Sequence, residues 1–341
     1  MSRVRWVTVL VGAVLLAIGS NPAQAANELF GWVFTSGSPG SSRLVTFNLA
    51  TGARSTIGAA TPDCCFASGA SALDGPGGRF FFTGNYLSES PGTDPVRLFT
   101  VSTTTGAVVD DDPLAAGFWN FLEWDPGSNQ LFAVVNVAST STLYTVNTST
   151  GARTAVGAGV ANCCLVSGKV SALDIAGDRF FFVARLTTDG GTVSRIFTFD
   201  LNSGALVTSP APLLPSTNNY NFLGWDPTPG TLFAVVRDTT NSDEDLLTIN
   251  PTTAAVAQVG ASIPDCCGVS SGVGAVDPNG NRFLFLGVRS SLGETARRLW
   301  TLDLADGSVD NNPLLSDGEN YNWVEFAADP LPVELLDFGV W

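Results

Sequence analysis

The 341-residue sequence contains no histidine and a single lysine, Lys169. Without an imidazole the chain cannot form a Ser-His-Asp or Cys-His catalytic system, a histidine metal site or a C-x-x-C-H haem attachment. Any catalysis must therefore use carboxylates, tyrosine, arginine, thiols or a bound cofactor. The sequence carries 16 Lys and Arg against 31 Asp and Glu, a net charge of −15. Because such a surface repels phosphate backbones and anionic lipids, we expect no nucleic-acid or membrane-surface partner.

Long apolar runs are also scarce, and the main one lies at the N-terminus. Arg3 and Arg5 precede the apolar stretch 6–18, and Ala23-Gln24-Ala25 then gives a small-x-small cleavage pattern. This order is typical of a secretory signal peptide, and the run is short for a membrane span. An uncleaved anchor is the alternative interpretation. The sequence predicts a signal peptide over 1–25, cleavage after Ala25, a secreted (periplasmic or extracellular) protein without a membrane span, and a monomer.

Internal repetition dominates the remaining sequence, whose hydrophobic content of 45% is enough to form a core. An Arg-Phe-x-Phe segment recurs three times, each time after an Asp-containing turn. A related unit with a Trp-Asp-Pro turn lies between the first and second copies and again between the second and third. The copies of the first unit are 72–82, 172–182 and 275–285, and those of the second are 124–135 and 225–236.

Each unit reads as about four short strands over about 50 residues, because apolar and β-branched residues alternate with period two between turn residues. No stretch shows a convincing helical period. Half-buried strands of this kind are not stable alone, whereas stacking the units in a closed ring buries both faces and hides most sheet edges. The sequence therefore predicts an all-β fold, a six-bladed β-propeller built from three tandem double-blade repeats.

The two ends of the chain predict how the ring closes. The first unit, which starts at Leu29, lacks the innermost strand found in the others. The segment 321–326 matches 119–124, but no second strand follows it. We therefore expect the C-terminal strand to join the N-terminal blade, giving a propeller domain over 26–330 and a tail over 331–341.

The turn pattern L-x-x-V/I-D/N-x-x-T-G, seen for example at 143–151, resembles that of bacterial secreted β-propeller repeat proteins of the quinoprotein, YVTN and NHL-like kind. The resemblance covers nearly all of the mature chain and implies the propeller fold, but its motif identifies no activity. The Asp turns are similar to sialidase Asp-boxes as hairpin staples, although their spacing departs from that family. The tail resembles the start of a C-terminal linker of exported bacterial proteins.

Each double unit carries one pair of adjacent cysteines in the loop before an innermost strand. The pairs are Cys64-Cys65, Cys163-Cys164 and Cys266-Cys267. Because exported cysteines are usually oxidised, we expect disulfides, with a bond inside each adjacent pair as the leading arrangement. Disulfides between repeats, free thiolates that bind a soft cation such as Cu(I), and a purely bracing role for the loops are the alternatives.

A second threefold set combines an aromatic residue with an asparagine in the alternate loops: Trp119-Asn120, Tyr220-Asn221 and Tyr321-Asn322. Beside a channel mouth, such pairs would bind a sugar or an apolar ligand by ring stacking and amide hydrogen bonds. The alternative is that the rings pack between blades while the asparagines cap the start of each strand.

Acidic residues form the last candidate group. Glu123 and Glu325 hold equivalent innermost-strand positions, but the third equivalent is Gly224, so the acids break the repeat symmetry. Glycoside-cleaving propellers combine acids from separate blades in a comparable way, although sequence drift would give the same pattern. Acid-rich loops at 110–112, 243–245 and 310–312 offer oxygen ligands suited to Ca²⁺, without EF-hand spacing. Solvated charge runs are the alternative.

These observations favour a non-enzymatic module that binds a small molecule, glycan or protein at its loop-lined central face, because near-regular repeats contain no specialised acid–base group. The first alternative is a carboxylate- or calcium-dependent hydrolase or lyase at the central funnel. The second is a thiol-redox or soft-metal protein that uses the cysteine loops.

Overall fold

The computed structural model describes residues 28–35, 40–89, 95–165, 170–209, 211–239, 243–263, 266, 274–289, 292–294, 296–315 and 320–327. The expected signal peptide and the tail after residue 330 lie outside the described residues. Within the described residues, no helix is both long and apolar enough to cross a membrane. Helix is represented there by short 3₁₀ turns such as η1 (Thr187–Asp189).

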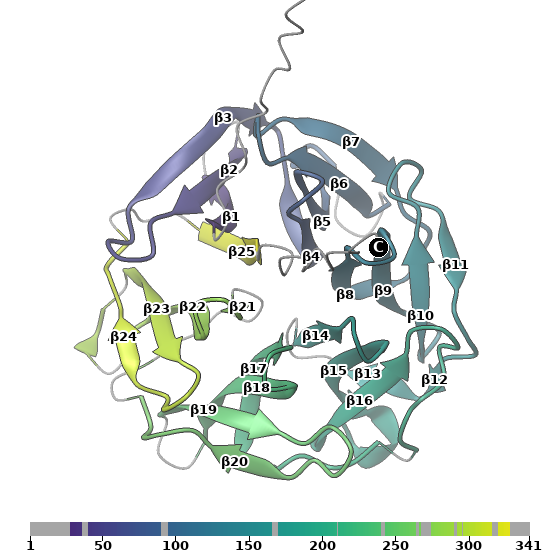
Figure 1. The fold of residues 1–341 in the computed structure, drawn as a ribbon. Helices are drawn as coiled ribbons and strands as arrows, with labels where there is room; N and C mark the ends of the chain where they lie inside the picture. Colours follow the sequence, from purple (N-terminus) through teal and green to yellow (C-terminus); the bar gives the residue numbers. More distant parts are fainter. Residues whose placement is uncertain are drawn as a thin grey trace, which may run out of the picture.

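Six small antiparallel sheets stand around a common axis, so the predicted six-bladed β-propeller is confirmed (Figure 1). The first three blades, each from its innermost strand outward, are β25 (Asn320–Ala327), β1 (Glu28–Thr35), β2 (Ser41–Phe47) and β3 (Arg54–Pro62); β4 (Phe66–Asp74), β5 (Arg79–Asn85), β6 (Arg97–Ser102) and β7 (Val108–Pro113); and β8 (Phe118–Asp125), β9 (Gln130–Val137) and β10 (Thr140–Val146), with β11 (Arg153–Ala155) and β12 (Val160–Ala161) both on β10.

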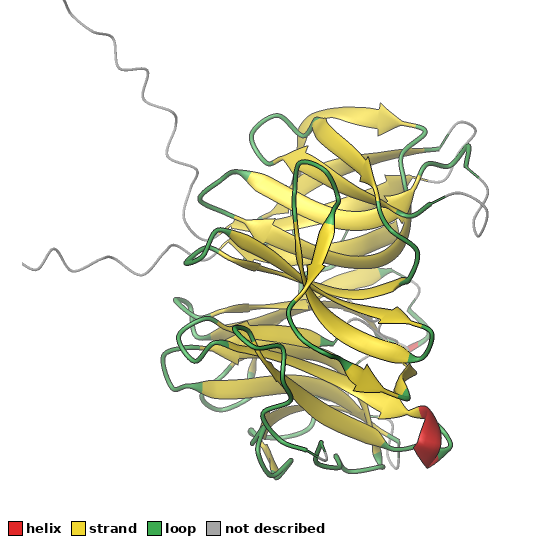
Figure 2. Cartoon of the chain, turned by 90° about the vertical axis from the view of Figure 1, so that its right-hand side faces the viewer, coloured by secondary structure: helices red, strands yellow, loops and turns green. Residues whose placement is uncertain are grey.

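The other three blades follow the same plan. They are β14 (Ser171–Asp174), β15 (Arg179–Leu186) and β16 (Ser194–Asp200), with β13 (Cys163–Leu165) also paired to β15; β17 (Asn218–Asp226), β18 (Thr231–Asp238), β19 (Glu244–Ile249) and β20 (Val256–Gln258); and β21 (Gly274–Asp277), β22 (Arg282–Val288), β23 (Arg297–Asp303) and β24 (Val309–Asn311). Seen from the side, the strands run across the thickness of the molecule (Figure 2).

The ring closes as the sequence predicts, because β25 pairs antiparallel with β1 in the N-terminal blade. Phe30 lies opposite Glu325 and Trp32 lies opposite Trp323. In Figure 1 the yellow C-terminal strand accordingly lies beside the purple N-terminal strand. The innermost strand of each blade contacts those of the two neighbouring blades. Six such strands therefore surround the axis and define the walls of any central site.

The core lies between the blades, which explains the unbroken aromatic runs. Phe80, Phe81 and Phe82 of β5 are all completely buried although they point to alternating sides. A strand buried on both faces reads as a continuous hydrophobic run. The Phe81 ring lies 5.4 Å from that of Trp124 in the next blade, and the Phe181 ring lies equally far from Trp225. These contacts lock successive blades together.

Asp residues hold the hairpins that leave each innermost strand of the first unit. Asp174 accepts hydrogen bonds from Arg179 Nε and Nη2, at 2.8 and 2.5 Å, and its other oxygen accepts from the backbone of Gly177. Asp74 and Asp277 bind their arginines in the same way. These staples close the tight turns and keep the innermost strands in register.

Candidate functional site: the central channel

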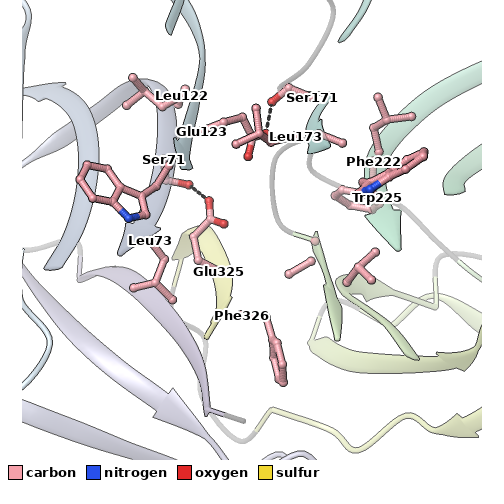
Figure 3. Close-up of a pocket in the computed structure, with 18 of the residues that line it drawn as sticks. Ser71, Leu73, Leu122, Glu123, Ser171, Leu173, Phe222, Trp225, Glu325 and Phe326 are labelled. Carbon is pink, nitrogen blue, oxygen red and sulfur yellow. Dashed lines mark hydrogen bonds between the residues drawn. The ribbon is translucent and has the colours of Figure 1, made fainter. Parts of the chain in front are cut away.

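A cavity of about 240 Å³ lies on the axis, inside the ring of innermost strands. Figure 3 shows the side chains around it. Most of the residues that line it have apolar side chains, although polar atoms provide more of the surface that faces the cavity, and the acidic residues in it are Glu123 and Glu325. Among the described residues that line the cavity, none is lysine or arginine. The channel therefore combines many apolar side chains with two carboxyl groups.

Each channel glutamate is held by a serine of the next blade. The Ser71 hydroxyl of β4 donates to Glu325 Oε1 of β25 at 2.5 Å. The Ser171 hydroxyl of β14 donates to Glu123 Oε1 of β8 at 2.6 Å. Both carboxyl groups point into the cavity (Figure 3). Each serine hydroxyl proton is therefore used within its pair.

The environment of Glu123 disfavours its ionised form. Burial raises the pKa of this carboxyl from 4.5 to about 8, repulsion by Glu325 adds to the shift, and the hydrogen bond from Ser171 opposes it. At neutral pH, Glu123 therefore binds a proton most of the time. A cation placed beside the pair would favour the ionised form instead.

The third sector of the channel contains glycine at both equivalent positions. Gly224 of β17 replaces the glutamate and Gly274 of β21 replaces the serine. A Cβ on Gly224 would lie 2.2 Å from Val276 Cγ2, and one on Gly274 would lie 2.8 Å from Phe222 Cδ1. Apolar side chains therefore occupy the space that the hydrogen-bonded pairs occupy elsewhere. The glutamate and its serine partner are thus both replaced in this repeat, so the difference is a paired change and not a single substitution.

Aromatic residues continue the wall one position further along three of the innermost strands, at Trp124, Trp225 and Phe326. The Arg79 guanidinium lies 4.8 Å from the centre of the Trp124 ring, and Arg179 lies 5.2 Å from that of Trp225. The arginines of the Asp staples thus also pack against the aromatic end of the channel.

The aromatic–asparagine set predicted as a ligand platform does not form one. Trp119, Tyr220 and Tyr321 are at most 5% exposed and pack in the core between blades. Trp119 Nε1 donates to the carbonyl of Ala115, and the Arg153 guanidinium covers its ring. The three rings thus pack between blades, as the alternative interpretation expects, and they are absent from the lining of the central cavity.

The asparagines of this set lie at β-bulges. The β8–β9 register shifts between Trp119 and Phe121, and the β17–β18 register shifts between Tyr220 and Phe222, which leaves Asn120 and Asn221 as the extra residues. Bulges of this kind bend a strand and redirect a side chain. Asn221 Nδ2 donates to Glu244 Oε2 at 3.2 Å. The third bulge, between β1 and β25, falls at Asn322, whose side chain lies outside the described residues.

The described cysteines are buried between blades and do not line the channel. Cys64 and Cys65 form a disulfide and are fully buried. They pack with Leu44, Phe82 and Phe99, and the amide of Cys65 donates to Ser42 Oγ. Cys163 and Cys266 are also disulfide-bonded and buried in the equivalent clusters. The Cys164 side chain and Cys267 lie outside the described residues.

These positions change the interpretation of the cysteine loops. The bond between Cys64 and Cys65 leaves neither sulfur for a disulfide between repeats. No free cysteine occurs among the described residues, so no thiolate site for a soft metal forms there. The Cys64–Cys65 pair instead packs as an apolar wedge between the N-terminal blade and the blade of β4–β7.

The acid-rich loops do not gather into a metal site in the part of the chain that the structure describes. No group of three or more Asp, Glu or Cys side chains there could hold an ion. Asp111, on the outer strand β7, accepts from the Tyr86 hydroxyl at 2.8 Å and faces Arg97. Asn311 donates to the backbone of Leu49 and so links the last blade to the first. These loops serve the periphery of the ring.

Glu244, which the sequence analysis placed in the acid-rich loop 243–245, is a buried acid. Burial raises the pKa of its carboxyl to about 8, Asn221 and Arg237 oppose the shift, and Asp245 adds to it. Its repeat equivalents are Ser42 and Ser141, both buried beside the cysteine segments. Glu244 therefore lies in the inter-blade core of the third repeat, away from the channel lining.

Ser71 and Ser171 are the site residues that sequence reasoning missed. A usable signal was present: the series Ser71, Ser171 and Gly274 changes in step with Glu325, Glu123 and Gly224. Residues that contact one another across blades are expected to change together when a repeat is modified. Reading the repeats in pairs of neighbouring strands would have revealed both partners.

Comparison with solved structures gives propeller neighbours at low sequence identity. A chain of a nidogen–laminin complex is 12% identical, with a TM-score of 0.56 over 88% of this chain and 98% of that one. A putative 6-phosphogluconolactonase from Bacteroides fragilis is 11% identical, with a TM-score of 0.51 over 89% and 99%. A protein from Lactobacillus plantarum is 11% identical, with a TM-score of 0.52 over 88% and 99%. No protein-family model and no curated protein matches the chain.

This likeness shows the fold alone. The neighbours include a protein from a binding complex and one described as a lactonase, so the fold is compatible with several functions. Function must be argued from the channel.

Proposed function

We propose that this chain is an exported binding protein that takes a small ligand into its central channel, between Glu123 and Glu325. One observation carries the proposal. Two half-buried carboxyl groups from separate blades converge on one cavity, and they do so where the threefold repeat is broken. Specialised residues at a broken symmetry are expected at a site, because structural needs are the same in every repeat.

The mixture of apolar side chains and polar groups in the wall supports small-molecule binding. Leu73, Leu173 and Phe326 surround the acidic groups, and the cavity of about 240 Å³ suits a compact ligand. Ligand sites of this type combine a mostly apolar lining with a few fixed polar groups. The absence of lysine and arginine from the described lining argues against a phosphorylated ligand such as a phosphogluconolactone, because no cation there would bind the phosphate.

The test uses three ring-bearing probes of similar size, namely benzylamine, benzyl alcohol and benzoate, measured by isothermal titration calorimetry. Ile175 lines the cavity and is 42% exposed, so Ile175→Trp places bulk at the channel opening without disturbing the core. We expect at least one probe to bind the parent protein saturably and to bind Ile175→Trp at least about tenfold more weakly.

The matched control is Val207→Trp, which adds the same ring at an exposed position outside the channel. It should leave the affinity unchanged. Failure of all three probes to bind, or equal weakening by the two tryptophans, would overturn the proposal.

A second candidate function is hydrolysis, and the raised pKa of Glu123 favours it. A carboxyl that keeps its proton at neutral pH is suited to act as a general acid, and Glu325 supplies a second carboxyl nearby. We expect any turnover of nitrophenyl glycosides or simple lactones to fall by at least about a hundredfold in Glu123→Gln. Measurable binding of these substrates without turnover would contradict hydrolysis and leave binding as the proposed function.

A further inference from the structure

We infer that the central channel selects an uncharged carbonyl compound, whose oxygen accepts a hydrogen bond from the carboxylic acid group of Glu123. This inference rests on the proposed function and names the ligand class of the same cavity. It follows from the hydrogen bonds of the Glu123 carboxyl group, from the surroundings that decide its charge, and from the position of an apolar sector in the ring.

One oxygen of the Glu123 carboxyl group is already used, and the other is available to a ligand. The Ser171 hydroxyl donates to Oε1 at 2.6 Å. Among the residues that the structure describes, none forms a hydrogen bond with Oε2, and the carboxyl group points into the cavity (Figure 3). The carbonyl oxygen of a carboxylic acid is its better acceptor, so Ser171 fixes Oε1 in that role and the acid proton lies on Oε2.

The surroundings of Glu123 keep that proton in place at neutral pH. Most side chains around the cavity are apolar, and no lysine or arginine lines it in the described part of the chain. A half-buried carboxyl group that accepts one hydrogen bond in such a cavity is favoured in its neutral form. Burial accordingly raises the pKa of Glu123 from 4.5 to about 8, and repulsion by Glu325 adds to the shift, although the bond from Ser171 opposes it. Oε2 therefore donates a hydrogen bond to a ligand that can accept it.

A donor at this position separates three classes of ligand. An ammonium group only donates, so it would bind only by displacing the Glu123 proton. A carboxylate ligand accepts, but no described lysine or arginine in the lining compensates its charge, and the chain carries a net charge of −15. A carbonyl oxygen accepts through two lone pairs and brings neither a charge nor a proton that needs a partner of its own.

An apolar sector of the channel accommodates the body of such a compound. Glycine stands at 224 and 274, where the other repeats carry the Glu–Ser pairs. The side chains of Val276 and Phe222 occupy that space, and both line the cavity. A compact ligand therefore meets a fixed donor at Glu123 and apolar side chains in this sector, a combination that is common in small-molecule sites.

The test compares acetophenone, benzylamine and benzoate on the full chain by isothermal titration calorimetry at pH 6 and pH 9.5. The three probes share a benzene ring and differ in the charge and hydrogen-bond role of the attached group. At pH 6 we expect acetophenone to bind at least about tenfold more tightly than either ion. Acetophenone has no group that titrates in this range, so its affinity should fall at least about tenfold between pH 6 and pH 9.5, as Glu123 loses its proton.

Glu123→Gln tests which group causes the pH dependence. Ser171 holds the amide oxygen at the Oε1 position, so the amide nitrogen still donates to the ligand but does not titrate. We expect this variant to keep the acetophenone affinity within about threefold of the parent value at pH 6 and to lose the pH dependence. The other titratable group in the described lining is Glu325 of β25, since β4, β14, β17 and β21 contribute none there.

The matched control is Glu244→Gln. It removes a second acid whose pKa is raised to about 8, but this acid lies away from the channel lining. The variant should keep the pH dependence of the parent protein. Thermal melts verify that both variants are folded, and the comparison of probes and of pH values on the parent protein stands without either variant.

The outcomes distinguish the inference from the function on which it rests. If benzylamine or benzoate binds as tightly as acetophenone at pH 6 and Ile175→Trp weakens it, the channel is a binding site but the ligand class is wrong. A folded Glu123→Gln that loses acetophenone affinity at pH 6, or that keeps the pH dependence, would also overturn the inference. If neither acetophenone nor the probes of the proposed function bind, both proposals fall.

Discussion

The turns at the end of the innermost strands and the channel beside them follow opposite rules across the three repeats. Asp74, Asp174 and Asp277 hold their arginines and turn amides in the same geometry each time. In the channel, two repeats carry a Glu–Ser pair and the third carries two glycines. Every blade needs its hairpin, so the hairpin residues stay constant. The channel positions are not required by the hairpin of every blade, so their residues can differ between repeats.

The joint change of both channel partners gives this comparison a physical basis. A buried carboxyl without its serine would lose its hydrogen bond, and a buried serine without its carboxyl would leave a donor unpaired. Removing one partner alone is therefore unfavourable. Replacing both by glycine, and filling the space with Val276 and Phe222, avoids the penalty.

The largest expected effect is that of Glu123 on the pH dependence of stability. The pKa of Glu123 is raised from 4.5 to about 8 in the folded chain. The folded state therefore binds the proton more tightly, and this contribution is complete below about pH 4.5 and is lost as pH rises through 8. We expect the unfolding free energy of the parent protein to fall by about 3 kcal/mol between pH 5 and pH 9, and this fall to be absent in Glu123→Gln. The value is smaller than the full pKa shift would give, because water reaches the channel.

Urea denaturation at pH 5, 7 and 9 measures this difference. Glu294→Gln is the control, because Arg298 lowers the pKa of this exposed carboxyl and any effect belongs below about pH 4.5. A flat difference between Glu123→Gln and the parent across pH 5–9 would show that the channel acid is not strained by its surroundings.

A smaller loss of stability is expected when one of the Asp staples, which are the same in all three repeats, is removed. Asp174→Ala removes two hydrogen bonds to Arg179 and one to the Gly177 amide, from a carboxyl that is 3% exposed. We expect a loss of about 2–3 kcal/mol in unfolding free energy, moderated because the arginine side chain is 32% exposed. Chemical denaturation at pH 7 measures it.

Because the staple is structural, Asp74→Ala and Asp277→Ala should lose similar amounts, and exposed Asp310→Ala should lose almost nothing. Unequal losses among the three staples would mean that the repeats are not equivalent at their turns either, and the contrast with the channel would disappear.

The sequence was sufficient for the architecture because the architecture repeats. The recurring Arg-Phe-x-Phe strands and Asp turns predicted the number of blades, and the match of 321–326 to 119–124 predicted closure. Glu123 and Glu325 were visible as a broken repeat. Their serine partners were not, because contacts between neighbouring blades depend on the stagger of innermost strands, which spacing along one chain does not give.

Burial explains the two interpretations that changed. Adjacent cysteines and aromatic–asparagine pairs both stand in loops before innermost strands, where a linear reading places them on an exposed rim. In the ring these loops turn inward between blades, so Cys64 and Trp119 join the core. Whether a loop folds over the channel or into an inter-blade seam depends on packing against the next blade, here Phe82 and Phe99 for the disulfide.

The smallest expected effect concerns the inter-blade contact of the cysteines. It tests whether they belong to the constant scaffold or to the variable channel. Cys64→Ala/Cys65→Ala removes a disulfide between neighbouring residues, which constrains the unfolded chain little because the loop it closes is minimal. The loss should therefore come from packing of two buried sulfurs, about 1–2 kcal/mol by urea denaturation. Acetophenone affinity should stay unchanged, because neither cysteine lines the channel. A fall in affinity at unchanged stability would instead place the cysteine seam in the binding machinery, and the division between constant scaffold and variable channel would have to be redrawn.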